Sequence, residues 1–143
     1  RHNLNYWRYG DYLAIGAGAL AKVTSVDGQI LRSAGAAHPR EYQRRIEAGG
    51  RAGELQSVLA ADRPFEFMLN ALRLREGVAV EDYRAHTGLE LVTLQPGLTA
   101  ALEAGLMDPL STARLRASPR GWRFLDDLQA LFLPRGDAVA KSR

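Results

Sequence analysis

One stretch of the sequence, residues 62–74 (DRPFEFMLNALRL), is apolar on every side when it is read as a helix. One helical face carries apolar residues at positions i, i+3, i+4 and i+7, namely Phe65, Met68, Leu69 and Leu72. The opposite side is apolar as well through Phe67, Ala71 and Leu74. A helix of this kind is stable only at the centre of a hydrophobic core. The sequence therefore predicts a globular domain around this helix, with Asp62 as its cap and Pro64 in its first turn.

A β-hairpin is predicted upstream of this helix. Residues 22–26 and 29–32 flank the dipeptide Asp27-Gly28. Asp-Gly readily supplies the positive φ angles of a two-residue turn, so the two runs are expected to pair as antiparallel strands. Residues 1–21, which are rich in Tyr and Gly, are expected to form a strand and loops.

Helix and turn signals place further elements on both sides of the central helix. The predicted helices lie at residues 39–47, 53–61, 80–86 and 89–104, and a last helix begins after Ser118, its cap. Two short strands are expected at residues 106–107 and 113–117. The predicted fold class is therefore α+β. Helices followed by a two-stranded wing and a last helix make residues 80–133 similar to a winged helix.

These elements divide the chain into three predicted parts. Residues 1–38 hold the strands and the hairpin, and residues 39–134 form a mainly helical domain. Residues 135–143 are small, polar and charged, and they are expected to form a flexible tail.

The chain of 143 residues contains no Cys. Its own residues therefore exclude a disulfide framework and any zinc or iron–sulfur site held by thiolates. No apolar run approaches the roughly 20 residues that span a bilayer, and no signal peptide is visible at the start of the sequence. A cytoplasmic location is expected on these grounds.

The charge pattern argues against sequence-specific binding of DNA. In a winged helix the second helix, here residues 89–104, would enter the major groove. The sequence has no Lys or Arg between Arg84 and Arg114, whereas Glu90 and Glu103 would repel phosphate. Nucleic acid is therefore not expected to be a partner, although the segment after residue 109 is basic. That basic segment is read most simply as a solvated surface.

The start of the sequence, HNLNYW at residues 2–7, is rich in residue types that bind ligands. The imidazole of His2 is a common ligand of metals and of haem iron, but it is also an ordinary polar group at the end of a strand. Tyr6 and Trp7 can stack on a flat macrocycle or simply cover a core. Physical chemistry alone leaves both readings open.

Four motifs together resemble one family. They are HNLNYW (2–7), GDYLAIGAGA (10–19), EFMLNALRLREGV (66–78) and SPRGWRFLDDL (118–128). In this combination the chain resembles the oxygen-independent coproporphyrinogen III oxidase-like radical SAM proteins, and among them the HemW-type haem chaperones. The similarity extends over nearly the whole chain.

The resemblance implies cofactors that this chain does not hold alone. Proteins of this family carry a radical SAM barrel, in which three cysteines bind a [4Fe–4S] cluster that holds S-adenosylmethionine. Because this chain has no Cys, it is expected to be the C-terminal part of such a protein. Residues 1–38 would then be the last strands and a hairpin extension of the barrel. The radical SAM half would be the partner that supplies the cluster.

Site residues follow from the matching motif positions. In HNLNYW, the resemblance assigns His2, Asn3, Tyr6 and Trp7 to haem binding, with His2 as the ligand of the haem iron. No catalytic residue is assigned, and this part alone is not expected to catalyse a reaction.

Gly16, Gly18 and Leu20 match the segment that faces the S-adenosylmethionine region. The chaperone branch usually has a His where this chain has Leu20, and the oxidase branch has an aliphatic residue there. An oxidase that decarboxylates coproporphyrinogen III is therefore the first alternative to a chaperone that delivers haem to acceptor proteins. A winged-helix module for protein interactions, at residues 80–133, is the second. A peripheral membrane contact and a dimer are further partners that the sequence leaves open.

Overall fold

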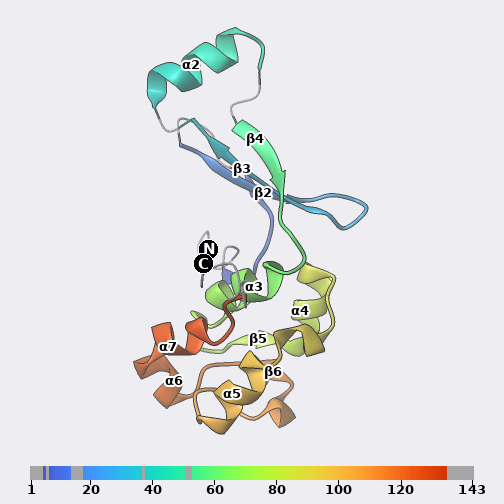
Figure 1. Cartoon of the computed structure of the whole chain (residues 1–143), viewed down its shortest axis with the longest axis vertical. Helices are drawn as coiled ribbons and strands as arrows, with labels where there is room; N and C mark the ends of the chain where they lie inside the picture. The colour runs from blue at the N-terminus through green and yellow to red at the C-terminus, as the bar shows by residue number, and fades with distance from the viewer. Residues whose placement is uncertain (1–4, 6, 14–17, 37, 51–52, 135–143) are drawn as a thin grey trace, which may run out of the picture. The chain divides into compact units, whose positions relative to one another are not determined.

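A computed structural model describes residues 5, 7–13, 18–36, 38–50 and 53–134. The chain divides into two compact units (Figure 1). The sheet unit comprises the described residues up to Leu59 except Trp7–Tyr9, and the helical unit comprises Trp7–Tyr9 and the described residues from Ala60 onward. The structure thus has a mixed α and β composition, as expected for the α+β class. The predicted division at residues 38 and 134 stays a prediction, and the predicted tail lies outside the described residues.

The sheet unit is a four-stranded antiparallel sheet with the strand order β1-β2-β3-β4. Its strands are β1 (Tyr12–Leu13), β2 (Leu20–Thr24), β3 (Ile30–Gly35) and β4 (Gly53–Ser57). Helix α2 (Pro39–Glu47) lies in the connection between β3 and β4 (Figure 1). Sequence predicted this helix and its first residue, because Pro39 is favourable at the first helical position.

The predicted hairpin is present as β2 and β3, but its turn differs from the prediction. Thr24 pairs with Ile30, and the amide of Gly28 donates to the carbonyl of Ser25 at 2.9 Å. Gly28 has a φ of 82°, whereas a two-residue turn of the predicted kind needs two such residues in succession. The turn is therefore a longer loop in which Gly28 alone supplies the positive φ.

The predicted helix at residues 53–61 is wrong, because residues 53–57 form β4. β4 pairs antiparallel with β3, with Gly53 opposite Gly35 and Leu55 opposite Ser33. A Cβ at Gly53 would lie 2.3 Å from the carbonyl oxygen of Ala34, so the close approach of the two strands requires glycine there. Pairing with a distant strand outweighs the local preference for a helix.

Helix α3 (Arg63–Ala71) is the centre of the helical unit, as its sequence predicts. Phe67, Met68 and Ala71 have no exposed surface. The ring of Phe67 makes edge-to-face contacts with Tyr9 at 5.7 Å and with Tyr83 at 5.1 Å between ring centroids. The predicted side-chain cap by Asp62 is not formed; instead, the Asp62 carbonyl accepts the amide of Glu66 at 3.1 Å.

Short helices and one small sheet surround α3. These elements are β5 (Val78–Ala79), α4 (Val80–Thr87), η1 (Leu91–Leu94), α5 (Gly97–Glu103), η2 (Leu110–Thr112), β6 (Arg114–Leu115), α6 (Pro119–Arg123) and α7 (Leu125–Ala130). β5 and β6 pair antiparallel. Gly88 ends α4 with a φ of 71°, as predicted. Within the part of the chain that is described, no helix has the length and apolar character to cross a membrane.

Two predicted helices are interrupted. The predicted helix at residues 89–104 divides into η1 and α5 because Gln95 is extended and Pro96 has no amide hydrogen to donate. The last helix divides at Phe124, whose φ of −121° and ψ of 44° are not helical. Ser118 caps its first part as predicted, and its hydroxyl accepts the amide of Gly121 at 3.0 Å.

The two predicted short strands are reduced. The strand predicted at residues 113–117 is shortened to Arg114–Leu115, which form β6. The strand predicted at residues 106–107 is reduced to a single β-bridge between Met107 and Ala117.

The central position of Phe67 gives a first prediction. Phe67→Ala removes a ring with no exposed surface and its contacts with two tyrosines, so the free energy of unfolding should fall by about 3–5 kcal/mol. Denaturant unfolding measures this change. Phe124→Ala is the control, because half of the Phe124 side chain is exposed and its loss should cost far less. Equal effects of the two substitutions would contradict the central role of Phe67.

Candidate functional site

The structure describes only part of the predicted site. Trp7, Gly18 and Leu20 are described. The other predicted site residues lie outside the described residues: His2, Asn3, Tyr6 and Gly16. Trp7 belongs to the helical unit, whereas Gly18 and Leu20 belong to the sheet unit.

The end of the HNLNYW motif is anchored on helix α3. Tyr9 is 1% exposed, and its hydroxyl donates to a carboxylate oxygen (Oε2) of Glu66 at 3.0 Å. Arg8 forms an ion pair with Glu76, with 3.9 Å between Nη2 and Oε1. Trp7, directly before these two residues, is half-buried. The chain directly after Trp7 is therefore fixed to the core of the helical unit through Tyr9.

Tyr9 makes this anchoring possible through an unusual backbone conformation. Its φ of 62° lies in the left-handed region, which costs energy for a residue other than glycine. Burial of its ring beside Phe67 and the hydrogen bond to Glu66 offset that cost. Sequence analysis did not assign a role to Tyr9, because nothing local distinguishes it from the other aromatic residues near the start of the chain.

The residues of the predicted S-adenosylmethionine region begin strand β2. Gly18 has a φ of 71° and donates its amide to the carbonyl of Ala36 at 2.8 Å, so glycine is needed for this turn. Leu20 follows in β2 with 46% of its surface exposed. An exposed aliphatic side chain at this place is free to contact a ligand or another segment.

A buried lysine that sequence analysis missed joins β1 to β2. Lys22 is 2% exposed, and its ammonium lies 3.5 Å from Oδ1 of Asp11. Asp11 also accepts the amide of Thr24 at 2.9 Å and its hydroxyl at 2.8 Å. Burial alone would raise the pKa of Asp11, but the bonds from Thr24 and the charge of Lys22 outweigh it and hold the pKa below its ordinary value. Asp11 is therefore ionised at neutral pH.

The helical unit has a hollow of about 650 Å³ lined by arginines. We call it the arginine pocket; its lining residues are Arg75, Asp108, Arg116, Ala117, Pro119, Trp122 and Arg123. Arg75 follows α3, Arg116 follows β6, and Trp122 and Arg123 lie in α6. Asp108 lies opposite Arg116, because its amide donates to the Arg116 carbonyl at 3.0 Å. Their side chains also form an ion pair from Nε of Arg116 to Oδ2 of Asp108.

No group of three or more His, Cys, Asp or Glu side chains among the described residues is placed to hold a metal ion. Two further histidines are described, and both lie away from HNLNYW in sequence. His38 caps α2, where its Nδ1 accepts the amide of Arg40 at 3.3 Å. His86 is in the last turn of α4. Sequence analysis assigned neither of them a role.

Comparison with known proteins identifies the class of this domain. Residues 58–124 match the family model of the HemN C-terminal domain. This range covers α3 to α6, so it contains the core helix and the residues that line the arginine pocket. No solved structure matches the chain.

The curated relatives narrow the resemblance to one branch. The chain is 41% identical over 134 residues to "Heme chaperone HemW" of Escherichia coli (strain K12), which covers 93% of this chain and 34% of that protein. It is 38% identical over 133 residues to "Heme chaperone HemW" of Haemophilus influenzae, covering 93% of this chain and 33% of that protein. The predicted resemblance to HemW-type proteins is confirmed. The chain spans about a third of the length of these relatives.

A more distant relative carries the radical SAM name. "Radical S-adenosyl methionine domain-containing protein 1, mitochondrial" of Dictyostelium discoideum is 29% identical over 108 residues. The match covers 61% of this chain and 23% of that protein. It agrees with the wider family that the motifs predicted.

The ionised state of Asp11 gives a second prediction. Asp11→Asn should lower the free energy of unfolding at neutral pH by about 1 kcal/mol, since the carboxylate is partly exposed and screened. A carboxyl with a lowered pKa stabilises the fold above its unfolded pKa, near 3.9, and this contribution is lost as the pH falls through the folded pKa. The difference between the two proteins should therefore shrink below about pH 4.

Urea unfolding at several pH values measures this difference. Glu47→Gln, which removes one negative charge from the exposed end of α2, is the matched control. A difference that stays constant from neutral to acidic pH would show that Asp11 acts through packing and not through its charge.

Proposed function

We propose that this chain is the C-terminal portion of a haem chaperone that binds haem and delivers it to acceptor proteins. The observation that carries the proposal is HNLNYW, in a chain whose relatives bear the name heme chaperone. In this proposal His2, Asn3, Tyr6 and Trp7 bind haem, and the imidazole of His2 is the ligand of the iron. A cytoplasmic location remains an expectation.

The anchored end of the motif supports this proposal. A flat macrocycle needs an aromatic surface that does not rearrange when it binds. Trp7 is half-buried, and the two residues after it are held by Glu76 and Glu66. The backbone on the C-terminal side of Trp7 is thus ordered before a ligand binds, which lowers the entropic cost of binding. In this proposal Arg8 and Tyr9 fix the backbone next to Trp7, and Trp7 forms one side of the haem site.

The sheet unit is proposed to continue a radical SAM barrel. By register, Leu13, Ala21, Ser33 and Leu55 share one face of the sheet. Leu13 is 78% exposed and Leu55 is exposed as well, so this face offers apolar surface to another segment. When bound, the [4Fe–4S] cluster and S-adenosylmethionine of the full-length protein would supply radical chemistry. The cluster ligands would come from the N-terminal half, with Gly16, Gly18 and Leu20 near S-adenosylmethionine.

A coproporphyrinogen III oxidase is the second candidate function, and Leu20 is the observation in its favour. An exposed aliphatic residue stands there, as in the oxidase branch. Anaerobic turnover of coproporphyrinogen III by the reconstituted full-length protein separates the two candidates. Decarboxylated product would support the oxidase, and its absence together with haem binding would support the chaperone.

The winged-helix module is the third candidate. Residues 80–133 contain α4, α5, the bridge between Met107 and Ala117, and β6, and this set of elements supports a winged-helix arrangement. Helix α5 carries no basic residue, which favours protein partners over nucleic acid. Val92→Glu changes a side chain of this segment that is 71% exposed, and it should then reduce transfer of haem to an acceptor while the haem-binding band remains.

The proposal predicts a specific effect at His2. In the full-length protein, His2→Ala should shift and weaken the Soret band in a haem titration and should lower the affinity by at least about tenfold, because an axial ligand of the iron is lost. His86→Ala is the matched control, since it removes an imidazole from α4. A Soret band that is identical in wild type and His2→Ala would remove His2 from the mechanism.

A further inference from the structure

The arginine pocket has the charge of a binding site for two carboxylates. Its lining contains three guanidinium groups, from Arg75, Arg116 and Arg123, and one carboxylate, from Asp108. The lining therefore carries two more positive than negative charges. Guanidinium groups form their strongest hydrogen bonds with carboxylate and phosphate oxygens, often in pairs.

Two of the three arginines are held in place before any ligand binds. The ion pair with Asp108 fixes Nε of Arg116, which leaves the two terminal nitrogens of that guanidinium to other acceptors. The guanidinium of Arg75 lies over the ring of Trp122, with its Cζ atom 5.6 Å from the ring centroid. Groups that are already ordered lose less entropy when a ligand binds. The pocket is thus prepared for an anion.

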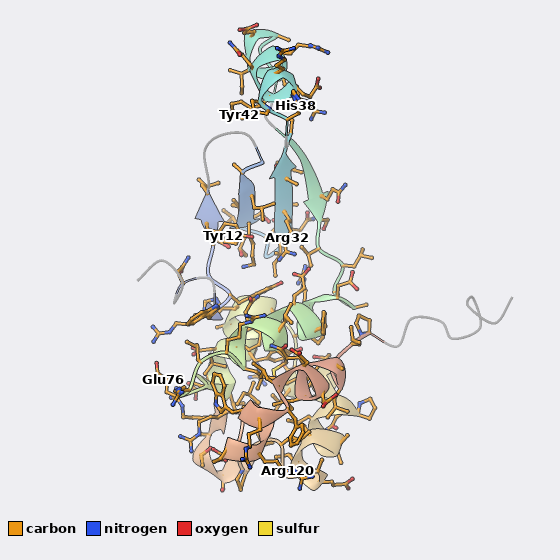
Figure 2. The ribbon with its side chains drawn as sticks, turned by 90° about the vertical axis from the view of Figure 1, so that its left-hand side faces the viewer. Tyr12, Arg32, His38, Tyr42, Glu76 and Arg120 are labelled. Carbon is orange, nitrogen blue, oxygen red and sulfur yellow. The ribbon has the colours of Figure 1, made fainter. Side chains whose placement is uncertain are left out.

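An ion pair links the residue after the HNLNYW motif to the segment that carries Arg75. Arg8 forms its ion pair with Glu76, and Glu76 is the neighbour of Arg75 in the chain. Trp7 comes directly before Arg8 and belongs to the same helical unit as the pocket. Figure 2 labels Glu76 at the edge of this unit. Trp7 is thus connected to the pocket residue Arg75 through one chain neighbour on each side of this ion pair.

Haem carries two propionate carboxylates on one edge of a flat, apolar ring. We propose that the arginine pocket binds these two carboxylates, while Trp7 of the same unit contacts the ring. This inference rests on the proposed function and adds the residues that orient the ligand. Arg75, Arg116 and Arg123 are binding residues in it, and Asp108 and Trp122 are positioning residues that hold two of them.

The size of the hollow agrees with this assignment. About 650 Å³ is within the range of pockets for small organic ligands, roughly 300–1,000 Å³. A phosphate monoester carries a similar double negative charge, so the shared chemistry is that of a dianion with several acceptor oxygens. The porphyrin is favoured because the Arg8–Glu76 ion pair ties the residue after Trp7 to the chain neighbour of Arg75.

The test uses metal-free mesoporphyrin, which has the two carboxylates and no iron, with the full-length protein that contains this chain. The double variant Arg75→Gln/Arg123→Gln should bind mesoporphyrin about tenfold or more weakly than wild type, because charge-assisted hydrogen bonds are lost. The dimethyl ester of mesoporphyrin should bind wild type and variant equally. Porphyrin fluorescence measures each affinity.

Arg120→Gln is the matched control. Arg120 lies in the same short helix as Arg123 and is exposed, but it does not line the pocket (Figure 2). Arg120→Gln removes one positive charge, as the single variant Arg123→Gln does, and it should leave mesoporphyrin affinity unchanged. A loss in Arg120→Gln equal to the loss in Arg123→Gln would mean that net charge alone attracts the porphyrin, and it would overturn the proposal.

Further outcomes separate this inference from the proposed function. Haem binding that responds to His2→Ala, together with equal mesoporphyrin affinity in wild type and the double variant, would overturn the pocket and leave the chaperone in place. Mesoporphyrin binding that depends on the arginines, without any haem complex, would support the pocket and overturn the chaperone. Inorganic phosphate could instead raise the melting temperature of wild type but not of the double variant, in a protein that binds no porphyrin. That outcome would assign the pocket to phosphate and overturn the porphyrin assignment.

Discussion

The edge-to-face contact of Phe67 with Tyr9 and Tyr83 is the interaction on which the helical unit depends. The three rings come from segments that are far apart in the chain, and α3 brings them together. Both tyrosines keep their hydroxyls paired, Tyr9 with Glu66 at 3.0 Å and Tyr83 with Thr93 at 2.7 Å. Aromatic rings can thus fill the core without leaving a buried polar group unpaired. The same cluster ties the end of the HNLNYW motif to the core.

Sequence predicted the elements that depend on local signals. The apolar pattern of α3, the glycine that ends α4 and the cap at Ser118 each lie within a few residues of the structure that they define. The elements that depend on distant partners were not predicted. β4 is a strand only because β3 accepts it, and the break at Phe124 has no turn residue to mark it. Local preference is a weak guide where tertiary contacts decide.

The same difference between local signals and distant partners applies to the candidate site. Motif positions indicated Trp7 and Leu20, but the motif itself says nothing of the partners that hold them. The ion pair of Lys22 with Asp11 joins two strands, and a lysine in a strand gives no sign that it will be buried. The arginine pocket could not be found from sequence either, because Arg75 lies some forty positions before Arg116 and Trp122. Only the packing of α6 and β6 beside the end of α3 makes them neighbours.

The attachment of Tyr9 to the core has a thermodynamic consequence. A ring that is 1% exposed cannot leave the core without opening the helical unit around it. Local fraying of the chain directly after Trp7 is therefore coupled to cooperative melting of α3 and its neighbours. Any molecule that binds the native form at Trp7, and not the unfolded chain, must raise the melting temperature of the helical unit in proportion to the logarithm of its concentration above its Kd. The melting temperature measured by calorimetry therefore reports ligand binding at Trp7, even for ligands that have no absorbance band.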